Sequence, residues 1–142
     1  MGMSFWDFYS LIEKEYDFVR KRIMSECKLT SVEVDVLLFL SNNPKADTAS
    51  DVVKTRKITK SYVSLAVKQL MEKEYLIRKT EDGNQKSLHL IITPKATKVV
   101  NYGKQMQREF LNKMFKGFTK QEKEEFYSFY ERIAVNLRKD NY

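Results

Sequence analysis

The chain has 142 residues, of which 42% are hydrophobic and 32% are charged, a composition typical of a folded domain and not of a disordered chain. No apolar run approaches the roughly 18 residues that a membrane-spanning helix needs, and Met1–Asp7 lacks the features of a secretory signal. We therefore expect a single domain over residues 1–142, located in the cytoplasm and without a membrane partner.

The sequence contains one cysteine, Cys27, and one histidine, His89. A single cysteine cannot form an internal disulfide, and the two residues together do not make a zinc site. The carboxylates are spread over predicted helix surfaces, so we predict no catalytic site, no metal and no cofactor. Cys27 is expected to be a packed structural thiol rather than an oxidation sensor. His89, on the outer side of a strand, is expected at the surface or beside a binding partner, and not as a metal ligand.

The net charge of +7 is concentrated in the middle of the chain. Residues 44–100 hold twelve basic and six acidic groups, whereas residues 1–43 hold five basic and seven acidic groups. This distribution suggests a surface that faces a polyanion, although a solvated basic surface explains the charge alone equally well.

Hydrophobic spacing predicts four helices in the first half of the chain. Residues 4–26 carry apolar side chains every three or four positions, and residues 31–41 are apolar on most of the helix surface, which indicates burial on several sides. A short third helix follows Thr48 and a fourth follows Thr59. The apolar face of the fourth helix consists of Val63, Ala66, Val67 and Leu70.

The periodicity then changes from that of a helix to that of a strand. Residues 76–80 and 87–92 are β-prone, and Glu81-Asp82-Gly83-Asn84 between them is a turn signal, so we predict a β-hairpin. Thr93-Pro94 opens a fifth helix, because proline is well tolerated at the first helical position. A sixth helix is expected over residues 120–138. The predicted order is α-α-α-α-β-β-α-α, a mainly α fold with a small β-hairpin.

The fourth helix differs from the others at its start. Four other helices begin with a hydroxyl residue followed three positions later by an acid, as in a capping box. These pairs are Ser4 with Asp7, Thr30 with Glu33, Thr48 with Asp51, and Thr119 with Glu122. The fourth helix instead has Lys60, Ser61 and Tyr62 in its first turn, where a cation opposes the helix dipole. A phosphate group is a natural partner for such a helix start.

The exposed face of the predicted fourth helix suits a DNA groove. Lys60, Ser61, Tyr62, Ser64 and Lys68 provide hydrogen-bonding, aromatic and cationic groups. Two short helices joined by a short turn form a helix-turn-helix, and the hairpin that follows forms a wing. The basic wing residues Arg78, Lys79 and Lys86 can reach phosphates or an adjacent minor groove.

With these elements the sequence resembles the MarR family of winged-helix regulators. The matching stretches are LTSVEVDVLLFL from Leu29, DVVKTRKITKSYVSLAVKQLMEKEYLIRK from Asp51, and LIIT from Leu90. The resemblance implies a winged helix-turn-helix lobe over residues 30–94 and dimerisation helices over residues 1–28 and 95–142. The residues expected to contact DNA are Lys57, Thr59, Lys60, Ser61, Tyr62, Ser64, Lys68, Arg78, Gln85 and Lys86.

Four positions depart from the family pattern. The wing of the family usually carries Asp-x-Arg, and Asn84-Gln85-Lys86 stands here instead, which keeps one charge but loses the planar guanidinium. Glu74 and Ala96 occupy positions where the family usually has glycine. The wing contact is therefore expected to be weaker than in the family.

The resemblance also implies a homodimer. Exposed apolar residues near both termini would favour association, and packing within one subunit is the alternative. They are Phe5, Trp6, Phe8, Tyr9 and Ile12 at one end, and Phe126, Phe129, Tyr130, Ile133 and Leu137 at the other. A dimer would place two recognition helices about one DNA turn, roughly 34 Å, apart, so the operator would be an inverted repeat.

The function expected from these features is a DNA-binding repressor that responds to a small aromatic or lipophilic effector. Trp6, Tyr9, Tyr102 and Met106 are the candidate effector-pocket residues, with core packing as the competing explanation for the same side chains. The alternative function is a winged-helix module that docks an acidic protein partner.

Overall fold

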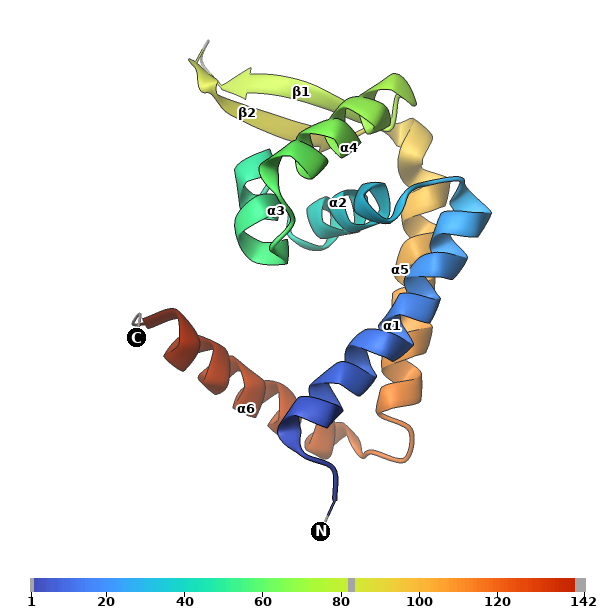
Figure 1. Ribbon diagram of the computed structural model, residues 1–142, viewed down its shortest axis with the longest axis vertical. Coiled ribbons are helices and arrows are strands. Elements are labelled where there is room, and N and C mark those ends of the chain that lie inside the picture. Colours follow the sequence, from blue (N-terminus) through green and yellow to red (C-terminus); the bar gives the residue numbers. More distant parts are fainter. Residues whose placement is uncertain (1, 82–83, 140–142) are drawn as a thin grey trace. The chain divides into compact units, whose positions relative to one another are not determined.

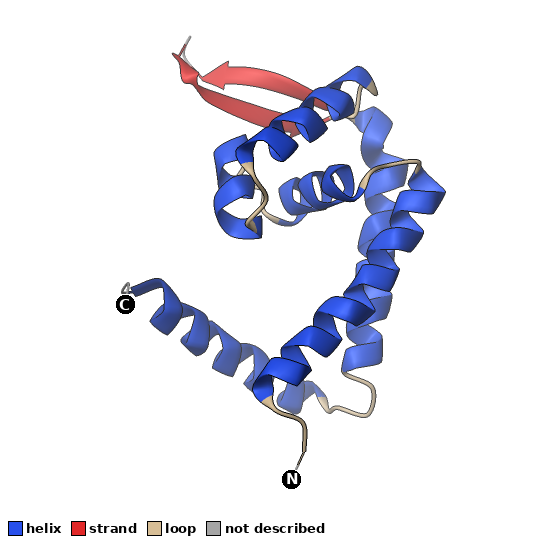
Figure 2. Ribbon diagram, in the orientation of Figure 1, coloured by secondary structure: helices blue, strands red, loops and turns tan. Residues whose placement is uncertain are grey.

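The computed structural model describes residues 2–81 and 84–139, apart from the side chains of residues 81–87. The elements are α1 (Phe5–Cys27), α2 (Ser31–Asn42), α3 (Ala49–Arg56), α4 (Lys60–Glu72), β1 (Leu76–Glu81), β2 (Asn84–Ile92), a 3-10 turn (Pro94–Ala96), α5 (Thr97–Met114) and α6 (Lys120–Lys139). Helices dominate, and the described strands form one hairpin (Figure 2). The predicted order and fold class are confirmed, with most boundaries within one or two residues and β2 beginning three residues earlier than expected. The chain forms two compact units, Met1–Arg108 and Glu109–Tyr142.

The helix starts follow the predicted capping chemistry closely. Complete capping boxes join Thr30 to Glu33 and Thr48 to Asp51. At the start of α6 the Thr119 amide donates to Glu122 Oε1 over 2.8 Å, and the Glu122 amide donates back to Thr119 Oγ1. The first of these bonds lowers the pKa of Glu122, because it stabilises the ionised carboxylate. α1 has only half a box, in which Ser4 Oγ accepts from the Asp7 amide.

The core of the first unit forms around α2, which lies among α1, α3, α4 and the hairpin (Figure 1). Its buried apolar residues are Val34, Val36, Leu37, Leu38, Phe39 and Leu40, packed with Val63, Val67 and Leu70 of α4 and Leu76 and Leu90 of the hairpin. One acid is also buried there: Glu33 is 1% exposed, and its carboxylate lies 2.6 Å from Lys73 Nζ at the end of α4. The near-continuous apolar sequence of α2 is thus explained by burial on several sides.

The hairpin packs its inner face on this core. β1 and β2 are antiparallel, with Leu76 opposite Ile92 and Lys79 opposite His89. The segment before α3 is hydrogen-bonded to β2, since the Leu90 amide donates to the Asp47 carbonyl over 2.8 Å. His89 is less exposed than a residue of the open surface: its Nδ1 lies 2.7 Å from Asp47 Oδ1, and both side chains are half-buried. The sequence does not predict this contact, because Asp47 and His89 are far apart along the chain.

α5 packs on α2 at a glycine. A Cβ atom added at Gly103 would lie 2.7 Å from Leu38 Cδ2, so the close approach of the two helices depends on the missing side chain. Gln107 Nε2 of α5 donates to the Tyr16 hydroxyl of α1 over 2.8 Å. The buried face of α5 contains Val100, Gly103 and Met106.

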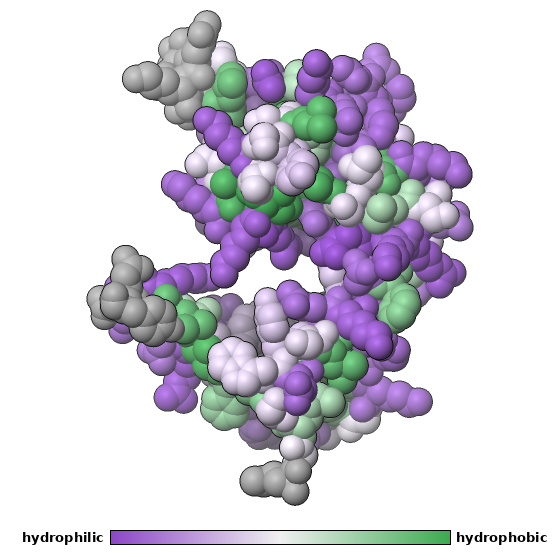
Figure 3. Space-filling model, in the orientation of Figure 1, coloured by the Kyte–Doolittle hydropathy of each residue, from purple (hydrophilic) through white to green (hydrophobic). Residues whose placement is uncertain are grey.

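The second unit buries little of its apolar surface. Phe115 is buried at the centre of an aromatic group formed with Phe118, Phe126 and Tyr127, with ring centroids 5.3–5.6 Å apart. No residue of α6 is buried, and Phe129 and Leu137 are 56% and 68% exposed. Figure 3 shows hydrophobic side chains, in green, at the surface along α6. Within the described ranges, no helix is both long and apolar enough to cross a bilayer.

Candidate nucleic-acid interface

α3 and α4 form the predicted helix-turn-helix, joined by residues 57–59. Lys57 ends α3 in the left-handed conformation, with φ 53°, and Thr59 is the N-cap of α4 with extended backbone angles. The left-handed residue reverses the chain within three positions, so that α4 begins directly beside the end of α3. The sequence thus positions the start of α4 through a tight turn in which Lys57 and Thr59 are exposed and Ile58 packs against the core.

The first turn of α4 is open and cationic. Thr59 Oγ1 accepts from the Tyr62 amide over 3.4 Å, a long bond, and no acid lies in this turn. Thr59, Lys60, Ser61 and Tyr62 are all exposed, and Tyr62 is 62% exposed. Among the described residues, no carboxylate forms an ion pair with the Lys60 ammonium. The amides and cation of this turn are therefore available to an anion.

The outward face of α4 continues with Ser64 and Lys68, both exposed as expected. Lys60 and Ser64 line one side of a cleft of about 230 Å³ whose other side is α3. The α3 residues in this cleft are Ala49, Ser50 and Val53. Sequence reasoning missed Ser50, although its position two residues after the Thr48 cap, in the first turn of a short helix, could have identified it. The cleft gives α4 and α3 a shared outward surface with two hydroxyls and one ammonium.

The wing contributes a second set of cations. Arg78 and Lys79 of β1 are both exposed to solvent. The predicted contacts at Gln85 and Lys86, and the departure at Asn84, concern side chains outside the described residues. Of the ten predicted DNA contacts, the structure therefore places eight, all exposed, on the α3–α4 turn, on α4 and on β1.

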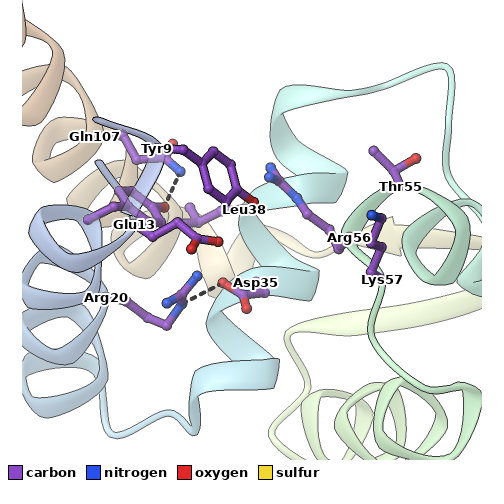
Figure 4. Close-up of a pocket in the computed structure, with 10 residues that line it drawn as sticks. Tyr9, Glu13, Arg20, Asp35, Leu38, Thr55, Arg56, Lys57 and Gln107 are labelled. Carbon is purple, nitrogen blue, oxygen red and sulfur yellow. Dashed lines mark hydrogen bonds and ion pairs between the residues drawn. The ribbon is translucent and has the colours of Figure 1, made fainter. Parts of the chain in front are cut away.

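A cavity of about 330 Å³ lies beside the helix-turn-helix within the first unit (Figure 4). α1 supplies Tyr9, Glu13, Tyr16 and Arg20, α2 supplies Asp35 and Leu38, the end of α3 supplies Thr55 and Arg56, the α3–α4 turn supplies Lys57, and α5 supplies Gln107. The Arg20 guanidinium binds Asp35 Oδ1 over 2.9 Å, and Arg56 stacks on the Phe39 ring at 5.6 Å. The lining is polar and charged, with cations on the side of the turn.

The four candidate effector residues do not share this cavity. Tyr9 lines it, whereas Tyr102 lines a separate pocket of about 370 Å³. Met106 is buried in the core, and Trp6 is 74% exposed near the start of α1. Among the described pockets of a single subunit, none therefore contains all four residues.

The pocket at Tyr102 also contains the single cysteine. Cys27 lies there with Glu26, Tyr75, Lys98 and Val99. Burial raises the pKa of the Cys27 thiol, and the charge of Glu26 raises it further. The thiol is thus kept protonated at neutral pH, which agrees with a packed residue. Among the described residues, no three His, Cys, Asp or Glu side chains gather to hold a metal ion.

Comparison with known proteins supports the same fold. Residues 28–87 match the model of the MarR family. A MarR-family transcriptional regulator from Silicibacter pomeroyi matches the structure with a TM-score of 0.80 and 21% identity, over 95% of this chain and 90% of that one. A putative MarR-family regulator from Listeria monocytogenes, solved with a 26mer DNA, matches with a TM-score of 0.80 and 20% identity, over 96% and 90%.

Residues 28–87 are similar to the MarR-family model, and the chain has the fold of the MarR-family structures. A third MarR-fold structure, of MepR from S. aureus bound to DNA, has a TM-score of 0.73 at 15% identity, over 95% of this chain and 97% of MepR. No curated protein matches the sequence. The family resemblance noted in the sequence is thus confirmed, and the MarR-family match includes the whole of α3, α4 and β1.

Proposed function

We propose that this MarR-fold protein is a transcriptional regulator that binds double-stranded DNA with α4 in the major groove. The observation that carries the proposal is the first turn of α4, where Lys60, Ser61 and Tyr62 are exposed and no acid is present. The other capped helices start with an acid of their own, so α4 alone among α2, α3, α4 and α6 offers its positive end to an external anion. The two DNA-bound structures of the same fold support this assignment.

The roles of the interface residues follow from their positions. Lys57, Lys60, Lys68 and Arg78 neutralise phosphates, whereas Ser61, Tyr62 and Ser64 face the base edges. Ser50, in the cleft with Lys60, adds a hydroxyl from α3. Phosphate contacts of this kind make binding steeply dependent on salt.

The protein acts as a homodimer on an inverted-repeat operator. The support is that α6 has no buried residue although its apolar residues recur at helical spacing on one face. The first turn of α1 likewise leaves Phe5 and Trp6 exposed. Contiguous apolar surfaces are rarely left exposed in monomeric proteins, and a second copy of the chain would cover these two.

Repression is relieved by a small effector that binds in the cavity of Figure 4. The cavity reaches Arg56 and Lys57, the residues that lead into α4, so an occupant would shift the recognition helix. Its charged lining favours a polar effector with an anionic group over the lipophilic one we expected from the family. Compounds that release DNA should raise the melting temperature of the parent protein, and should lose their effect in Tyr9→Ala.

Selection of bound duplexes from a random pool, followed by titration at several salt concentrations, tests the DNA proposal. Lys60→Ala should lower the slope of log affinity against log salt by about one unit per subunit. Lys14→Ala, which removes the same charge from α1, is the matched control and should leave the slope unchanged. Ser64→Ala should instead change the selected sequence.

The same experiment separates the alternative function. A module that docks an acidic protein would show only weak, sequence-independent DNA binding that disappears at moderate salt. An enriched inverted repeat supports the regulator. Binding without any enriched sequence, unchanged by Lys60→Ala, would overturn it in favour of the protein-docking module.

A further inference from the structure

His89 connects the wing to the helix-turn-helix. Its Nδ1 lies 2.7 Å from Asp47 Oδ1, and the next residue, Leu90, donates its amide to the Asp47 carbonyl over 2.8 Å. A carboxylate can only accept, so the imidazole carries its proton on Nδ1 and donates it to Asp47. Asp47 thus holds β2 through both its main chain and its side chain.

Asp47 occupies a position that transmits this contact to the DNA-facing surface. It immediately precedes Thr48, whose hydroxyl and backbone close the capping box of α3 with Asp51. The next two residues, Ala49 and Ser50, form the α3 side of the cleft that Lys60 and Ser64 of α4 complete. The link from His89 therefore ends at the first turn of α3, beside the start of α4.

On the wing side, His89 lies opposite the cationic strand. Lys79 is its partner in the hairpin register, and Arg78 is the partner of Leu90. A two-stranded hairpin is only marginally stable by itself, so its angle to the helices depends on what fixes its base and edge. The Asp47 contacts supply such a fixation midway along β2.

We infer that His89 is a positioning residue for DNA binding, which holds the wing cations Arg78 and Lys79 at a fixed spacing from the start of α4. This inference rests on the proposed function, because it assigns the two cation sets to one duplex. The wing and α4 then approach the DNA as one rigid body. Without the His89–Asp47 hydrogen bond the wing would sample several angles, and each phosphate contact would have to be ordered on binding.

A DNA-independent measurement tests the link itself. Hydrogen exchange of the Leu90 amide should be about tenfold faster in His89→Phe and Asp47→Ala than in the parent. Asp47→Asn retains an acceptor for the imidazole and should restore protection. Asp17→Ala, which removes a carboxylate of similar exposure from the Lys21 ion pair on α1, is the matched control and should leave Leu90 unchanged.

A DNA measurement then tests the positioning role. On the duplex selected by the parent, His89→Phe and Asp47→Ala should bind about fivefold more weakly, with a smaller salt slope and lost protection at the flanks. Protection of the central major-groove positions should remain. Asp47→Asn should rescue both affinity and flank protection. Circular dichroism at the binding temperature confirms that each variant is folded, and a purely structural role would leave the slope and the flanks of the folded fraction unchanged.

The outcomes of the inference and of the proposed function are distinct. If the parent selects an operator and both His89→Phe and Asp47→Ala keep the parent salt slope and flank protection, the positioning role is wrong and DNA binding stands. If the parent binds no duplex, the proposed function fails and the positioning role fails with it, whatever the Leu90 amide does.

Discussion

α2 of the winged-helix lobe and α6 are both rich in apolar residues but differ in whether those residues are packed. α2 buries six apolar residues and one acid, whose carboxylate is paired with Lys73. α6 buries none of its residues, although its aromatic and aliphatic side chains recur at helical spacing. The difference shows that hydrophobic periodicity reports the need for a packing partner and does not say whether the partner belongs to the same chain.

The largest expected effect comes from comparing the same substitution, phenylalanine to alanine, in the lobe and in α6. Phe39→Ala removes a ring that is 1% exposed in the core of the lobe and should cost about 3–5 kcal/mol of unfolding free energy. Phe129→Ala removes the same ring from α6, where it is exposed in the single chain. Denaturant unfolding at two protein concentrations checks the contrast. The loss at Phe39 should not depend on concentration, and the loss at Phe129 should disappear in dilute protein. A concentration-independent loss of equal size at Phe129 would mean that α6 packs within one subunit.

The second prediction addresses the partner of α6 directly. Ile133→Glu places a charge in the middle of the apolar face and should weaken self-association by about 2 kcal/mol or more, roughly 30-fold. Ser128→Glu adds the same charge on the opposite side of the helix and serves as control. Sedimentation velocity over a range of concentrations measures both. Unchanged association in Ile133→Glu would remove α6 from the dimer interface and leave its apolar face unexplained.

The third prediction concerns a strained position inside the self-sufficient lobe. Glu74 lies in the left-handed region with φ 63°, where the MarR pattern has glycine, and its carboxylate pairs with Lys95 over 2.7 Å. Glu74→Gly relieves the backbone strain at the loss of an exposed ion pair, and should raise the melting temperature by about 2–4 °C. Glu72→Gly, two residues earlier and still helical, should lower it. Melting followed by circular dichroism decides between the two signs, and a lower melting temperature in Glu74→Gly would show that the ion pair outweighs the strain.

Local chemistry made most of the fold predictable from the sequence. Three capping pairs formed complete boxes, and the unusual start of α4 stood out because its first turn lacks an acid. Turn residues and the alternation of apolar and polar residues located the hairpin. The positive φ at Glu74 explains why the family usually has glycine at this position. These features depend on residues within a few positions of one another, which a single sequence displays directly.

Contacts between distant segments were not predictable. The contact between His89 and Asp47 was not predicted, because nothing in the sequence of β2 shows that Asp47 lies beside it. Ser50 joins the α4 face only through the packing of α3 on α4. The candidate effector residues were chosen for aromatic and sulfur chemistry, whereas the cavity beside the helix-turn-helix is lined mainly by charged groups. Each of these depends on which elements meet, and periodicity carries no information on that.

The smallest expected effect lies at the edge of the lobe, where Cys27 is neither fully in the core nor open. Burial, followed by the charge of Glu26, raises the pKa of the thiol, so a smaller fraction is thiolate at any given pH than in a free cysteine. Alkylation by iodoacetamide at pH 8 should therefore be slower than that of glutathione, and should reach the same rate only at higher pH. Glu26→Gln removes the lesser cause and should speed the reaction by about twofold, whereas Glu13→Gln, near the other end of α1, should not. Reaction as fast as that of glutathione in the parent would place Cys27 outside the packed lobe and reopen an oxidation-sensing role for it.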